Sequence, residues 1–119
     1  MEKINNFKQL KIWQKGIEIV KDIYSITEKF PNKETRGLIS QMRRASVSIP
    51  SNIAEGFKRY HNKEYKQFLF IALGSCAELE TQLIISNELK YINKINMEAI
   101  CEKLDHLSRM TTVLIGKLK

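Results

Sequence analysis

Glycine and histidine are scarce in this chain, which has five glycines and two histidines among 119 residues. The glycines stand alone rather than in a cluster, so the sequence has no glycine-rich loop to cradle a phosphate. His61 and His106 each follow a lysine by three residues, so neither completes the Glu-x-x-His motif of di-iron bundles. No serine, histidine and carboxylate occur in an order that supports nucleophilic catalysis. The sequence therefore predicts a protein without catalytic residues, metal ligands or a cofactor.

Cysteine and long apolar runs are also scarce. Cys76 and Cys101 lie far apart, without the C-x-x-C spacing of a metal or redox motif, at positions that look helical and apolar. The first residues lack the apolar segment of a secretory signal, and no stretch approaches the roughly 20 apolar residues of a membrane-spanning helix. We therefore expect a cytoplasmic protein with free, buried thiols. A single disulfide between two helices is the alternative.

Only two prolines interrupt the helical pattern of the chain. Pro31 ends a first helix, because the residue before a proline is driven from the α region. An asparagine followed two residues later by a carboxylate predicts the start of each later helix, at Asn32, Asn62 and Asn96. These signals predict four helices over residues 6–30, 33–59, 63–90 and 97–117. Short connections are typical of antiparallel neighbours, so the predicted fold is all-α, one up-down-up-down four-helix bundle over residues 1–119.

Pro50, the second proline, lies inside the second predicted helix. A proline in a helix interior costs about 3 kcal/mol, because it lacks the donor N–H and crowds the preceding turn. The apolar stripe continues on both sides of it, so we expect one helix kinked at Pro50 rather than two helices. We interpret Ser48, Pro50, Asn52 and Glu55 as a structural motif with hydrogen bonds between helices. Gly74, in the third predicted helix, is interpreted as a point of close helix approach.

The first predicted helix has more apolar surface than one core requires. At about 100° per residue, its apolar side chains form two ridges on opposite sides. One ridge comprises Leu10, Trp13, Ile17, Val20 and Tyr24, and the other comprises Ile12, Ile19, Ile23, Ile26 and Phe30. The third helix repeats this pattern, because it is apolar on all sides over residues 68–73. Exposed apolar patches of this size are unusual in monomers. We therefore expect a homo-oligomer with its interface at Ile12, Ile19, Ile23 and Ile26, the alternative being a first helix wedged deeply between its partners.

Acidic residues are outnumbered, with 13 Asp and Glu against 20 Lys and Arg and a formal net charge of +7. Such a charge favours nucleic acid as a partner. In the predicted bundle, the start of the first helix, the turn between the second and third, and the end of the fourth meet at one end. That end collects the predicted nucleic-acid-binding residues Lys8, Lys11, Lys15, Lys58, Arg59, Lys63 and Lys66. Tyr60 and Tyr65 add rings on which bases can stack. The alternatives are aromatic end-caps and an ordinary solvated surface.

Three segments of the chain resemble a known family. They are residues 41–45 (QMRRA), 48–56 (SIPSNIAEG) and 74–80 (GSCAELE). They are similar to motifs of the four-helix-bundle proteins encoded in intervening sequences of bacterial 23S ribosomal RNA genes, and the resemblance spans nearly the whole chain. The chain is also similar, more distantly, to the accessory variability protein of diversity-generating retroelements. This second resemblance implies a homopentameric barrel that binds RNA or DNA.

The pattern of charge and apolar surface leads to two hypotheses of function. The first is a non-enzymatic, homo-oligomeric four-helix bundle that binds RNA or DNA through its basic end by neutralising phosphates. The second is a protein-interaction module that accepts a partner helix on the surplus apolar face and binds no nucleic acid. A stable monomer in solution would favour the second hypothesis.

Overall fold

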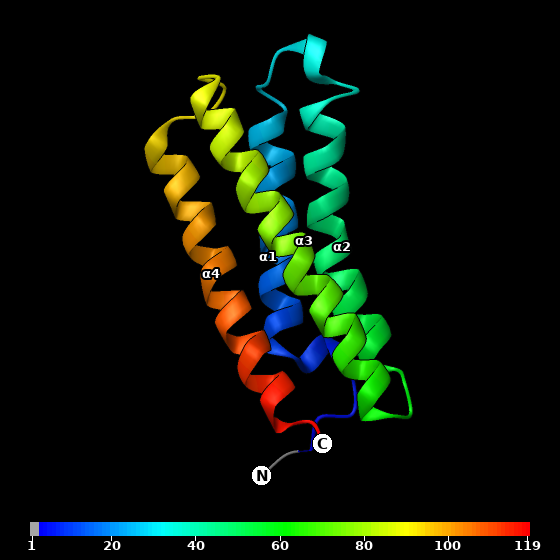
Figure 1. Cartoon of the computed structure of the whole chain (residues 1–119). Helices are drawn as coiled ribbons and strands as arrows, with labels where there is room; N and C mark the ends of the chain where they lie inside the picture. Colours follow the sequence, from blue (N-terminus) through cyan, green and yellow to red (C-terminus); the bar gives the residue numbers. More distant parts are fainter. Residues whose placement is uncertain (1–2) are drawn as a thin grey trace.

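Four long α-helices form the structure, a computed structural model that describes residues 3–119. They are α1 (Lys11–Thr27), α2 (Leu38–Phe57), α3 (Asn62–Glu88) and α4 (Lys94–Lys117), preceded or joined by the short 3₁₀ helices η1 (Phe7–Gln9) and η2 (Asn32–Glu34). Successive helices run in opposite directions (Figure 1), with α1 and α3 each packed against both α2 and α4. No strand occurs in the described part of the chain. The predicted all-α four-helix bundle is confirmed.

The asparagines that cap the helices are not the ones that the sequence predicted. Asn93 caps α4, because its Oδ1 accepts the backbone N–H of Asn96 at 2.7 Å. Asn6 caps η1 in the same way. The caps predicted at Asn32, Asn62 and Asn96 are wrong, because each of these residues lies inside the first turn of its helix. The spacing rule selected Asn96, which Glu98 follows by two residues, over the true cap Asn93, which Ile95 follows by two residues.

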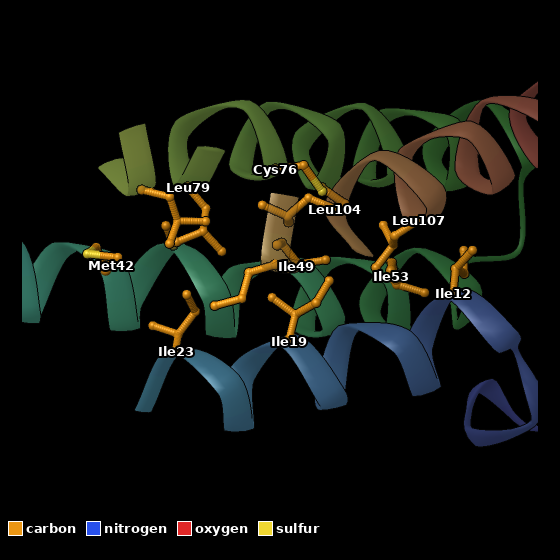
Figure 2. Packing of buried hydrophobic residues seen from close by; sticks show 14 of the residues in the cluster. Ile12, Ile19, Ile23, Met42, Ile49, Ile53, Cys76, Leu79, Leu104 and Leu107 are labelled. Atoms are coloured by element: carbon orange, nitrogen blue, oxygen red, sulfur yellow. The ribbon is translucent and has the colours of Figure 1, made fainter. Parts of the chain in front are cut away.

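The core contains the ridge of α1 that the sequence analysis assigned to an oligomer interface. Ile19 and Ile23 are 0% exposed and Ile12 is buried, while Ile26 is half-buried against the same cluster. Figure 2 shows Ile12, Ile19 and Ile23 pointing toward core side chains of the other helices. The predicted interface at Ile12, Ile19, Ile23 and Ile26 is therefore wrong, because this ridge packs inside the subunit.

The opposite ridge of α1 lies nearer the surface. Trp13, Ile17 and Val20 are half-buried and Tyr24 is exposed. Gly16 explains which ridge of α1 faces the core, because it lies on the buried stripe and allows α2 to approach closely. A Cβ at Gly16 would lie 3.2 Å from the Cβ of Pro50. The missing side chain thus lets the stripe of Ile12, Ile19 and Ile23 pack closely against α2.

Helix α2 continues through Pro50, whose ring is buried. Close to it, the Oγ atoms of Ser48 and Ser75 lie 2.8 Å apart and link α2 to α3. Asn52 donates from Nδ2 to the carbonyl oxygen of Ser48 at 2.8 Å and to its Oγ at 2.9 Å. Ser48 and Asn52 therefore form one polar network at the contact between the helices. The kink at Pro50 stays a prediction.

Glu55 and Gly74 do not have the roles that the sequence predicted for them. Glu55 was expected to bond to another helix, but it is exposed and pairs at 3.2 Å with Arg59, in the turn just after its own helix. Gly74 was expected at a close helix approach, but a Cβ there would have no neighbour within 4 Å. Gly56 has that role instead, because a Cβ there would lie 2.8 Å from the Cβ of Phe68. The end of α2 and the start of α3 therefore meet at a glycine.

Helix α3 is the one described helix long and apolar enough to cross a membrane by length and composition alone. The expectation that no stretch reaches this threshold was therefore wrong. Core helices of water-soluble bundles pass the same test, and Leu69, Leu79 and Leu83 of α3 are fully buried here. The outer side of α3 is apolar too: Phe70 is 56% exposed, Ile71 50%, Ile84 45% and Ile85 41%. One face of α3 thus packs in the core, and a second apolar face is exposed on the surface of the subunit.

Candidate nucleic-acid interface

Three segments meet at one end of the bundle, as the topology predicted. Residues 3–11, the turn between α2 and α3, and the C-terminus lie together there (Figure 1). The amide of Asn62 donates to the carbonyl oxygen of Lys119 at 3.2 Å and so joins the start of α3 to the end of the chain. We define the basic end by the exposed or half-buried side chains that these segments bring together. They are Lys8, Lys11, Lys58, Arg59, Lys63 and Lys66.

Five lysines of the basic end make no ion pair with any carboxylate of residues 3–119. They are Lys8, Lys11, Lys58, Lys63 and Lys66. All are exposed except Lys66, which is half-buried. An ammonium group without a carboxylate partner remains available to a phosphate, and several such groups on one surface attract a polyanion. The arrangement is chemically suited to backbone contacts with nucleic acid and shows no order for base-specific readout.

Arg59 is at the basic end, but its guanidinium group is already engaged. It pairs with the carboxylate of Glu55 at 3.2 Å and lies over the ring of Phe68, 4.7 Å from its centroid. An exposed pair of this kind is worth only about 0.2–1 kcal/mol. Arg59 is therefore held flat against the protein by weak contacts, and Glu55 offsets part of its charge.

Lys15 belongs to a different surface from the other predicted residues. Its Nζ lies 3.8 Å from Glu18, and its side chain lines a hollow between α1 and α4 with Glu102, His106 and Lys103. We therefore exclude Lys15 from the basic end. The sequence placed it there by its position near the helix start, but Lys15 lies one turn further along α1, where the helix packs against α4.

The two tyrosines near the turn have opposite environments. Tyr65 is buried and packs edge to face on Phe57, with 6.1 Å between ring centroids. Burial raises the pKa of its hydroxyl above the ordinary value. Tyr60 is 99% exposed. The end-cap alternative thus describes Tyr65, while Tyr60 has no packing role in the subunit.

Sequence reasoning missed Phe7 as a part of this end. Phe7 belongs to η1 and packs against Trp13, with 5.5 Å between ring centroids. It also lines a hollow of about 280 Å³ with Ser51, Ala54, Glu55, Lys58 and Arg59. Its position one residue before Lys8 gave no signal of this contact, because the hollow forms only when η1 packs on α2.

A charged cluster outside the basic end joins two helices. Lys103 of α4 reaches Glu18 and Asp22 of α1, each at 2.8 Å. The hydrogen bond from Lys103 lowers the pKa of Glu18, and hydrogen bonds to Asp22 and Glu18 raise the pKa of Lys103. These three groups therefore hold α4 to α1 while all are charged.

The remaining reactive groups are the cysteines and the side chains that could bind a metal ion. Both cysteines are free, as predicted, with Cys76 buried but Cys101 only half-buried. Burial raises the pKa of both thiols, so they are mainly protonated near neutral pH. Within residues 3–119, no three His, Cys, Asp or Glu side chains gather closely enough to hold a metal ion.

Comparisons with known proteins bear on the family of the chain. A comparison with curated proteins gives no match. Among solved structures, the chain is similar to a protein of unknown function from the S23 ribosomal protein family of Bacteroides thetaiotaomicron VPI-5482. The two share 22% sequence identity with a TM-score of 0.81, over 87% of this chain and 97% of the other, which shows a common fold.

The family assignment follows from a sequence profile. The profile of the 23S rRNA-intervening sequence protein family matches residues 8–113, which include all four α-helices except the last four residues of α4. The match agrees with the resemblance of residues 41–45, 48–56 and 74–80 noted above. The chain therefore belongs to the 23S rRNA-intervening sequence protein family.

Proposed function

We propose that this protein is a non-enzymatic bundle that binds RNA or DNA at its basic end by neutralising phosphates. The observation that carries the proposal is a set of five lysines that pair with no carboxylate of residues 3–119 and that come from separate segments to one end of the bundle. The opposite end mixes bases with Glu28, Glu34, Glu88 and Glu98. A polyanion is therefore attracted to one end in preference to the other.

Phosphate contacts of this kind tolerate any sequence and depend strongly on salt. Each neutralised phosphate releases condensed counterions, so log K falls with log salt by about 0.9 per contact for a duplex and about 0.7 for a single strand. Neutralising three contacting lysines should therefore lower the salt slope for a single strand by about two units.

The test compares two triple variants of equal charge change. We expect replacement of Lys11, Lys58 and Lys63 by glutamine to weaken oligonucleotide binding at least tenfold and to flatten the salt slope. The control replaces Lys29, Lys33 and Arg36, which are exposed at the opposite end, and should change both quantities much less. Fluorescence anisotropy across a salt series measures both. Equal losses from the two triples would mean general attraction without a site, and full affinity in the first triple would favour the protein-interaction hypothesis.

We propose further that the protein self-associates through the outer face of α3. Phe70, Ile71, Ile84 and Ile85 are each at least 41% exposed on this one helix, and between them lie Gly74 and Ala77, which would let a second helix approach closely. A homo-oligomer would also repeat the basic end and raise its affinity for a polyanion through avidity. The subunit number of five rests on the resemblance to the retroelement protein alone.

The self-association proposal predicts the effect of charge on the α3 face. Replacing Phe70 and Ile84 by glutamate should yield a folded monomer, because both side chains are exposed in the subunit and a charge at a buried interface is costly. Light scattering gives the mass and circular dichroism gives the helical content. The control is Val113→Glu on α4, which is 58% exposed and should leave the mass unchanged. A monomeric wild-type protein at tens of micromolar would refute self-association and support a different protein partner.

A further inference from the structure

Tyr60 is the large apolar side chain that the fold leaves most open to water. It is 99% exposed, whereas the next in order, Ile95, is 80% exposed. Its hydroxyl group makes no hydrogen bond within the described residues, and its ring stacks on no other ring there. The stability of the subunit therefore does not account for an aromatic residue at this position.

The turn that carries Tyr60 is short and held at both sides. The N–H of Arg59 donates to the carbonyl oxygen of Gly56 at 3.0 Å, and the N–H of Tyr65 donates to that of His61 at 3.1 Å. Only residues 58–61 separate α2 from α3. The turn is anchored by two helix ends, so the ring is presented from a fixed backbone position.

The charges around Tyr60 match a nucleic-acid strand. Lys58 precedes it by two residues and Lys63 follows it by three, and both are exposed and unpaired in the described residues. Between them, Arg59 presents a planar cation held against Phe68 and Glu55. Bases stack on aromatic rings and on guanidinium planes when they are not already stacked within a duplex. A strand with phosphates on the two lysines would bring an unpaired base to the ring.

We infer that the basic end is a site for single-stranded or looped-out nucleic acid, in which Tyr60 stacks on an unpaired base. This inference rests on the proposed function and adds the class of ligand to it. The lysines supply affinity for any phosphate backbone, and the ring supplies the preference for unpaired bases, because a duplex exposes no base faces along its length.

The test measures binding of the full chain to a labelled oligothymidylate, an oligouridylate and a DNA duplex of equal length. Base stacking contributes about tenfold or more in affinity per base. Tyr60→Ala should therefore weaken binding of the single strands about tenfold and of the duplex less than about twofold, with an unchanged salt slope. Tyr60→Phe keeps the ring and should bind like the wild type. Ile95→Ala, at the opposite end of the bundle, is the control for loss of an exposed apolar side chain.

The outcomes separate this inference from the proposed function. Equal losses for duplex and single strand in Tyr60→Ala, no loss at all, or a loss of the same size in Tyr60→Phe would each overturn the stacking role. If these results accompanied a large loss in the Lys11, Lys58 and Lys63 triple, the basic end would still bind phosphates. If the wild-type protein bound none of the three ligands, both proposals would be wrong.

Discussion

Replacing Ile19 by aspartate is expected to unfold the subunit. Ile19 is 0% exposed in the core, among side chains that include Ile49 and Ile53 of α2. An unpaired carboxylate there costs several kcal/mol, which is comparable with the total stability of about 5–15 kcal/mol of a small domain. Far-ultraviolet circular dichroism should show loss of most helical signal at room temperature.

The matched control for Ile19 lies on the other ridge of the same helix. Ile17 is half-buried rather than fully enclosed, so Ile17→Asp should retain the helical signal with a moderately lower melting temperature. If Ile19→Asp instead kept full helicity and only reduced the mass of an oligomer, Ile19 would be an interface residue and the core described above would be wrong.

Adding one methyl group at Gly56 is expected to destabilise the protein by about 1–3 kcal/mol, the usual range for overpacking. The new Cβ would lie 2.8 Å from the Cβ of Phe68 and 3.1 Å from the backbone oxygen of Tyr65. A backbone atom cannot move away as a flexible side chain can, so the ends of α2 and α3 would have to separate. The melting temperature of Gly56→Ala should therefore fall.

Gly116 provides the comparison for the Gly56 substitution. It lies in α4, and a Cβ there would meet nothing within 4 Å. Alanine is favoured over glycine in helices by roughly 0.5–1 kcal/mol, so Gly116→Ala should leave the melting temperature unchanged or raise it. A rise in both variants would show that the contact at Gly56 is not tight.

The number and direction of the helices could be predicted from the sequence, but the orientation of α1 could not be predicted from apolar residues alone. Both ridges of α1 have helical spacing, and a helical wheel does not say which one faces inward. The deciding signal was present in Gly16 and Thr27, which lie on the same stripe as Ile12, Ile19 and Ile23 and are buried with them. Small residues on one ridge indicate the side where a neighbouring helix comes close.

The candidate site was predictable in its location and not in its detail. Topology alone brought Lys8, Lys11, Lys58 and Lys63 to one end, because alternating helices must place these segments together. The sequence contained no comparable rule for ion pairs. Lys15 pairs with Glu18, which also binds Lys103 of another helix, so its environment depends on how α1 and α4 pack.

The most direct test of the central claim, that nucleic acid binds at the basic end, is amide chemical-shift mapping of the wild-type protein titrated with a single-stranded oligonucleotide. The account predicts that shifts concentrate at residues 7–11 and 58–66 and decline as salt is added. It predicts little change at residues 29–36, at the opposite end of the bundle. Shifts concentrated at that opposite end, spread evenly over the surface, or absent at low salt would contradict it.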